Sequence, residues 1–136
     1  MSGTPKHKHV IVIDDSQMDI LLIKMIFESI NYTEKLTIFQ QAEEALDYFK
    51  EINPGKDQEK LPDIVFLDIC MPGITGFEFL DKFNDLPEDI VKKTKFLIVS
   101  SSEDLSDMER STKYPNVKGY MVKPLKKQQL LNEENL

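Results

Sequence analysis

Short apolar runs alternate with segments of helical periodicity along the chain, and this alternation constrains the fold more than any other feature. The runs are rich in β-branched residues, and they cover 9–14, 35–40, 63–68, 95–100 and 116–123. Apolar strands that alternate with amphipathic helices predict a parallel sheet with helices on both faces. We therefore expect an α/β fold with a doubly wound, five-stranded parallel sheet.

Helical patterns separate and follow these runs. After the first run, Ser16 is placed to cap a helix that has Asp19 in its first turn. The apolar stripe that we expect this helix to bury consists of Met18, Leu21, Leu22, Met25 and Ile26. The other predicted helices lie in 41–52, 76–86, 101–114 and 124–136. We interpret 53–62 as a solvated loop and 86–93 as a connector.

Composition limits the function classes. A chain of 136 residues suits one domain, which we place at 8–132 between a flexible leader, 1–7, and a tail, 133–136. The net charge of −7 argues against binding to nucleic acid or to an anionic membrane surface. No apolar run approaches the length of a membrane span. We expect His7 and His9 to be solvated.

Cysteine usage bears on the compartment. Cys70 is the only cysteine, so an internal disulfide cannot form. This composition fits the reducing cytoplasm, and we expect a cytoplasmic location.

Polar side chains follow the apolar runs where the strands of a parallel sheet would end. The first run ends in Asp14 and Asp15, the third in Asp68, the fourth in Ser100 and the fifth in Lys123. Each residue alone is explained by a helix cap, a turn or a surface charge. Together they predict a phosphoryl-transfer site, because hard oxygen ligands favour Mg²⁺ or Mn²⁺ and a lysine stabilises phosphoryl oxygens.

The motifs at these positions occur in a known order. They are "IDD" at 13–15, "FLDICMPG" at 66–73, "IVSS" at 98–101 and "GYMVKPL" at 119–125. In this combination the chain resembles the receiver (response-regulator) domain of two-component signalling, of the chemotaxis-protein type. The resemblance covers residues 8–132 and implies a flavodoxin-like fold.

The resemblance implies an acceptor and its metal ligands. Asp68 would take a phosphoryl group from a phosphohistidine on a sensor histidine kinase or a histidine phosphotransfer protein. Asp14, Asp15 and Asp68 would hold Mg²⁺, with Mn²⁺ as the alternative ion. The backbone carbonyl of Cys70 would be a further metal ligand.

The resemblance also implies a conformational switch. Ser100 and Lys123 would bind phosphoryl oxygens, and Ser100 and Tyr120 would move on phosphorylation. The Lys123–Pro124 peptide bond would be cis. A downstream protein would then bind the face formed by the fourth helix, the fifth strand and the fifth helix.

Three functions remain open on the sequence. We favour a single-domain phospho-acceptor switch or phosphorelay shuttle, which is not an enzyme beyond slow autodephosphorylation. An aspartate-nucleophile phosphohydrolase is an alternative, but such enzymes usually carry a second acid where this chain has Cys70. The third alternative is a binding module on the receiver fold that works without phosphorylation.

Overall fold

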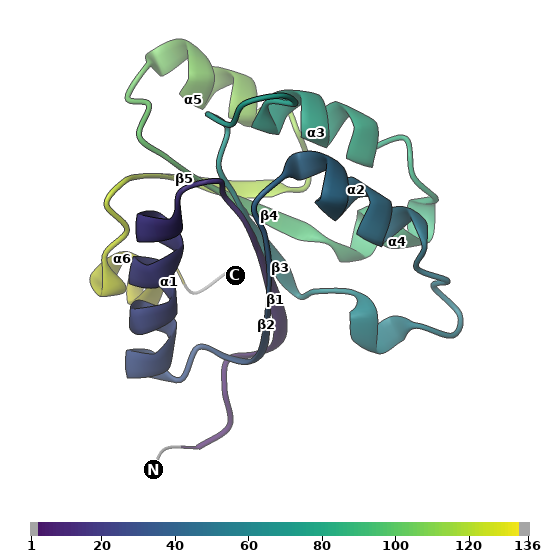
Figure 1. Cartoon of the computed structure of the whole chain (residues 1–136), viewed down its shortest axis with the longest axis horizontal. Coiled ribbons are helices and arrows are strands. Elements are labelled where there is room, and N and C mark those ends of the chain that lie inside the picture. Colours follow the sequence, from purple (N-terminus) through teal and green to yellow (C-terminus); the bar gives the residue numbers. More distant parts are fainter. Residues whose placement is uncertain (1–2, 134–136) are drawn as a thin grey trace.

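A computed structural model describes residues 3–133 and contains one five-stranded sheet, in which all neighbouring strands are parallel (Figure 1). The strands are β1 (His7–Ile13), β2 (Thr33–Phe39), β3 (Ile64–Leu67), β4 (Lys95–Ser100) and β5 (Val117–Val122). Their order in the sheet is β2-β1-β3-β4-β5. The predicted flavodoxin-like α/β fold is confirmed.

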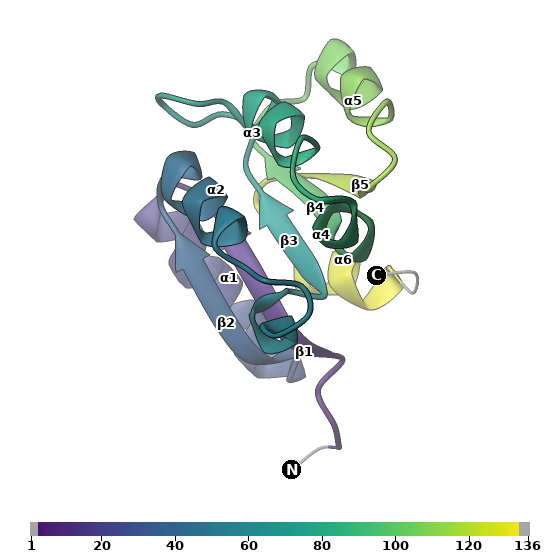
Figure 2. The same cartoon turned by 90° about the vertical axis from the view of Figure 1, so that its right-hand side faces the viewer.

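Helices cover both faces of the sheet. They are α1 (Gln17–Ile30), α2 (Ala42–Lys50), α3 (Gly76–Phe83), α4 (Glu88–Lys93), α5 (Leu105–Ser111) and α6 (Lys127–Asn132). Figure 2, turned so that α2, α3 and α4 face the viewer, shows α1 behind the sheet. Within residues 3–133, no helix is both long enough and apolar enough to cross a membrane.

Two segments are more ordered than the sequence predicted. The connector 86–93 contains the helix α4, which is anchored by the buried side chain of Ile90. The loop 53–62 contains a 3-10 turn, Gln58–Lys60, none of whose residues is buried. One buried isoleucine produces no helical periodicity, so the sequence pattern does not indicate this helix.

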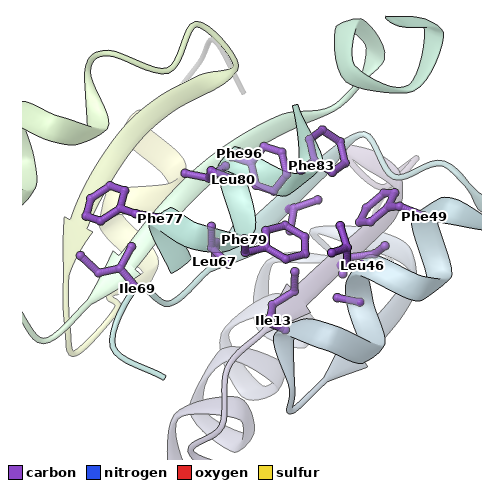
Figure 3. Close-up of a cluster of buried hydrophobic side chains, with 14 of the residues drawn as sticks. Ile13, Leu46, Phe49, Leu67, Ile69, Phe77, Phe79, Leu80, Phe83 and Phe96 are labelled. Atoms are coloured by element: carbon purple, nitrogen blue, oxygen red, sulfur yellow. The ribbon is translucent and has the colours of Figure 1, made fainter. Parts of the chain in front are cut away.

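The two faces of the sheet have separate cores. Strand side chains and the helices α2, α3 and α4 form one of them, in which aromatic rings meet edge to face (Figure 3). The ring centroid of Phe83 lies 5.0 Å from that of Phe49 and 4.9 Å from that of Phe96. On the other face, α1 and α6 pack on the sheet through Ile23, Phe27 and Leu130. Rigid packing on both faces fixes the position of the strand ends.

The prediction of the buried stripe of α1 is wrong. The helix buries Ile20, Ile23 and Phe27, whereas Met18, Leu21 and Met25 are exposed by 79%, 57% and 60%. The remaining two stripe residues, Leu22 and Ile26, are half-buried. Nearly every position in the middle of α1 is apolar, so two stripes overlap and helical spacing alone does not select the one that faces the sheet. Three large apolar side chains therefore stand on the outer surface of α1.

The prediction that His7 and His9 are solvated is also wrong. His7 belongs to β1, where it pairs with Thr33, and His7 and His9 are buried. Strand pairing accounts for this, because the backbone N–H of His7 donates to the carbonyl of Tyr32 and draws the chain into the sheet. Of the predicted leader and tail, residues 1–2 and 134–136 lie outside the described residues.

Candidate functional site

The strand ends converge as predicted. Asp14 follows β1, Asp68 follows β3, Ser100 ends β4 and Lys123 follows β5. The ammonium nitrogen of Lys123 lies 2.9 Å from Oδ2 of Asp14 and 3.1 Å from Oδ2 of Asp68. The carboxyl edge of the sheet thus brings a cation between two buried carboxylates, in the region where open α/β sheets bind ligands.

Asp68 is held on both carboxylate oxygens. Its backbone N–H donates to the carbonyl of Ile13, which continues the strand pairing, and its side chain is almost fully buried. Oδ1 accepts a hydrogen bond from the backbone N–H of Cys70 at 2.9 Å, and Oδ2 accepts one from Lys123. One oxygen is therefore fixed by the backbone, while the other faces the cation.

A close backbone approach supports the loop that follows Asp68. A Cβ atom on Gly76 would lie 2.6 Å from Cα of Ile69 and 2.7 Å from the carbonyl oxygen of Asp68. Real side chains do not approach backbone atoms this closely, so only glycine fits at the start of α3. Gly73 lies in the turn before it and has a φ of +83°, which glycine also favours. These two glycines allow the loop to turn sharply beside the Asp68 carboxylate.

Three carboxylates form a set of oxygen donors. One oxygen from each of Asp14, Asp15 and Asp68 lies within 4.8 Å of the other two. Asp15 is exposed, and the other two are buried. Hard oxygen donors at this spacing fit a hard divalent cation such as Mg²⁺ or Mn²⁺. The role of the Cys70 backbone carbonyl as a ligand stays a prediction.

Charge at this edge is only partly balanced. Burial raises the pKa of the Asp14 carboxyl, although hydrogen bonds from Lys123 and from the backbone N–H of Ser16 act against this. Burial also disfavours the charged form of Lys123, but the carboxylates around it outweigh burial and raise its pKa. Lys123 is therefore a permanent cation inside an acidic cluster.

Asp19 belongs to this cluster, although it does not follow a predicted strand. Its Oδ2 lies 2.7 Å from the ammonium of Lys123, and this bond lowers the pKa of Asp19. The sequence predicted only its place in the first turn of α1, where its backbone N–H donates to the Ser16 hydroxyl. A signal existed in the chain, because Asp19 lies one helical turn after Asp15 and near the same edge.

Ser100 and Tyr120 lie on one short chain of contacts. The buried Ser100 hydroxyl lies 3.5 Å from the sulfur of Cys70 and accepts a hydrogen bond from the backbone N–H of Ser102. The Tyr120 hydroxyl donates to the Ser102 carbonyl at 2.9 Å. The loop after β4 is thus bonded both to the site and to β5.

The peptide bond between Lys123 and Pro124 is cis, as predicted. The backbone N–H of Lys123 donates to the carbonyl of Ser100 at 2.8 Å, which continues the pairing of β4 and β5. Asp14, Asp15, Asp68, Ser100 and Lys123, the site residues predicted from the sequence, therefore gather at one edge.

Known proteins share this arrangement of elements. The structure of a two-component response regulator from Cytophaga hutchinsonii has a TM-score of 0.82 and 28% identity, and the match covers 93% of each chain. A response regulator receiver protein from Dyadobacter fermentans has a TM-score of 0.76 and 30% identity, with coverage of 90% of this chain and 91% of that chain.

Sequence relatives point the same way. The two-component response regulators ARR6 and ARR17 of Arabidopsis thaliana are 27% and 28% identical to 91% and 93% of this chain. The chain spans 66% of the length of ARR6 and 82% of that of ARR17. A family model described as the response regulator receiver domain matches residues 10–134. The chain therefore belongs to the response regulator receiver domain family, the phospho-acceptor switches of two-component signalling.

Proposed function

We propose that Asp68 is the residue that accepts the phosphoryl group. The observation that supports this is the different environment of its two carboxylate oxygens. One accepts a hydrogen bond from the backbone N–H of Cys70, and the other accepts one from Lys123. In the transfer, a carboxylate oxygen of Asp68 bonds to phosphorus while the bond from phosphorus to the donor's imidazole nitrogen breaks. The Lys123 ammonium stabilises the charge on the phosphoryl oxygens.

The acidic edge also suits a divalent metal. Receiver domains bind a divalent metal in an acidic pocket, and the oxygens of Asp14, Asp15 and Asp68 fit one. We infer that the ion is Mg²⁺, and that the carbonyl of Cys70 adds a ligand. When bound, the ion supplies positive charge that offsets the charge of the phosphoryl oxygens.

The switch is proposed to begin at Ser100. Its hydroxyl, now beside Cys70 and Ser102, would turn to a phosphoryl oxygen and draw the loop after β4 with it. Because the Tyr120 hydroxyl is bonded to the Ser102 carbonyl, movement of this loop reaches β5. We infer that a downstream protein binds the changed surface of α5, β5 and α6, where α5 and α6 are the predicted fourth and fifth helices.

Partners follow from the family. Receiver domains of two-component systems interact with histidine kinases or phosphotransfer proteins. We propose that such a donor phosphorylates this chain in the cytoplasm. We propose that it docks near α1, the helix that begins just after Asp14 and Asp15 and exposes Met18, Leu21 and Met25.

The experiment is phosphoryl uptake. Incubation with acetyl phosphate and Mg²⁺ should add one phosphoryl group to the wild type and none to Asp68→Asn, as measured by intact mass. Modification of Asp68→Asn to the same extent would contradict the assignment of the acceptor.

Phosphate release separates a switch from an enzyme. A receiver should release inorganic phosphate only slowly, by hydrolysis of its own phosphoaspartate. Steady turnover of many equivalents of a phosphoester would instead support the phosphohydrolase alternative.

A further inference from the structure

The ammonium of Lys123 has three carboxylate partners, and the shortest contact is not to the proposed acceptor. The distances are 2.7 Å to Asp19, 2.9 Å to Asp14 and 3.1 Å to Asp68. An ammonium group has three N–H donors. Lys123 donates hydrogen bonds to Asp19 and Asp68 and forms an ion pair with Asp14. A phosphoryl oxygen at Asp68 must therefore compete for Lys123 with the carboxylates that already hold it.

The three partners are not equivalent. Asp14 is buried, also accepts from the backbone N–H of Ser16, and belongs to the set of oxygen donors that fits a metal. Asp68 is the proposed acceptor. Asp19 stands outside that donor set, and its side chain is 34% exposed. Its carboxylate accepts a hydrogen bond from Lys123 and also interacts with the Ser16 side chain. Asp19 is thus the partner of Lys123 that is neither the proposed acceptor nor part of the donor set.

The position of Asp19 is set by α1. Ser16 caps this helix and accepts from the backbone N–H of Asp19, but the Asp19 side chain does not return the bond as in a capping box. It extends to Lys123, 104 residues away in the sequence. A carboxylate in the first turn usually stabilises its own helix, whereas this one binds a lysine on the other side of the site.

We propose that Asp19 is a positioning residue: it competes with Asp68 for the Lys123 ammonium. It thereby weakens the interaction of Lys123 with a group bound at Asp68. This inference rests on the proposed function. Removing the charge of Asp19 frees one donor of Lys123 for an oxygen or fluorine atom of the bound group. It also removes a negative charge close to an anion.

Beryllofluoride, which imitates a phosphoryl group on a carboxylate, provides the test. Its dissociation constant is measured by isothermal titration calorimetry at saturating Mg²⁺, so that a changed affinity for the metal does not contribute. Asp19→Asn should bind beryllofluoride about threefold to tenfold more tightly than the wild type. Asp19→Glu, which restores the charge, should return the constant to near the wild-type value.

A matched control comes from the same helix. Glu28→Gln removes one negative charge from an exposed position of α1 and should leave the constant unchanged. Equal or weaker binding by Asp19→Asn overturns the inference, as does tighter binding by Asp19→Glu to the same degree. A wild type that binds no beryllofluoride overturns the proposed function itself, which is a different result.

Discussion

Strand β1 buries ionisable side chains at both of its ends, in opposite ways. Beyond its carboxyl end, Asp14 has partners for both oxygens, the backbone N–H of Ser16 and the ammonium of Lys123. At its amino end, Nδ1 of His9 and Nε2 of His7 are buried without a hydrogen-bond partner among the described residues. One end supplies bonds to a charged group, and the other leaves polar atoms unpaired.

The other ring nitrogen of each histidine has a polar neighbour. Nε2 of His9 lies 2.8 Å from the Thr37 hydroxyl, and Nδ1 of His7 lies 3.7 Å from Asp63. Burial lowers the pKa of both imidazoles, and for His7 the attraction of Asp63 does not offset it. Lys6 and Lys95 lower the pKa of His7 further, and Lys35 lowers that of His9.

The difference teaches what each end tolerates. A buried carboxylate can stay charged where a cation serves it, whereas a buried imidazole without such a partner stays neutral. The carboxyl end places a carboxylate beside a cation, and the amino end buries its imidazoles in the sheet. Acid should therefore act on the two ends with opposite sign.

Removal of the cation should have the largest effect. Lys123→Met leaves Asp14 and Asp68 buried without a counter-charge, and we expect the free energy of unfolding to fall by about 3 kcal/mol in metal-free buffer. Urea denaturation at pH 7 with a chelator measures it. Lys118→Met, at an exposed position of β5, should change the value by less than about 0.5 kcal/mol. Similar losses in both variants would argue against a special role for Lys123.

Acid should weaken the amino end. The folded-state pKa of each histidine is below the ordinary 6.5, so the unfolded chain binds more protons between the two values and stability rises with pH there. The contribution is complete above pH 6.5 and is lost as pH falls through the folded-state pKa. We expect a loss of about 1 kcal/mol between pH 7 and pH 5.

The double variant His7→Phe, His9→Leu tests this assignment. These are the only histidines of the chain, so the variant should lose the slope of stability between pH 5 and pH 7. Urea midpoints at several pH values provide the measurement. An unchanged slope would mean that other groups cause the pH dependence.

Neutralising the carboxyl end should have a smaller and opposite effect. Because the folded-state pKa of Asp14 is raised, its favourable contribution is present at acidic pH and is lost as pH rises through that pKa. Asp14→Asn should therefore raise the free energy of unfolding by about 0.5 kcal/mol at pH 7 without metal. Asp47→Asn, exposed on α2, is the control with the same charge change. A loss of stability in Asp14→Asn would show that its pair with Lys123 outweighs burial.

Much of the site could be predicted from the sequence, for a geometric reason. Parallel strands end at one edge, so Asp14, Asp68, Ser100 and Lys123 had to meet once the strands were recognised. Asp19 could not be assigned in this way. Its contact with Lys123 depends on the direction of one side chain, which its position in a helical turn does not determine.

The errors in the fold have a similar origin. In α1, Met18 and Ile20 both belong to apolar stripes, and only packing against the sheet shows that Ile20 is the buried one. The histidines at the start of β1 look solvated among lysines, and only pairing with β2 shows that they are covered. Periodicity identifies the kind of element, while neighbouring elements decide which of its sides is buried.

The exposed methionines of α1 make it possible to detect chemically whether another protein covers this helix. Met18 and Met25 are exposed by 79% and 60%, whereas Met71 and Met121 are exposed by only 6% and 5%. Dilute peroxide converts accessible methionines to sulfoxides before buried ones. A protein that covers α1 would slow sulfoxide formation at the first pair and leave the second pair as an internal reference. Oxidation rates at four thioethers thus report whether this helix is occupied, without any label added to the chain.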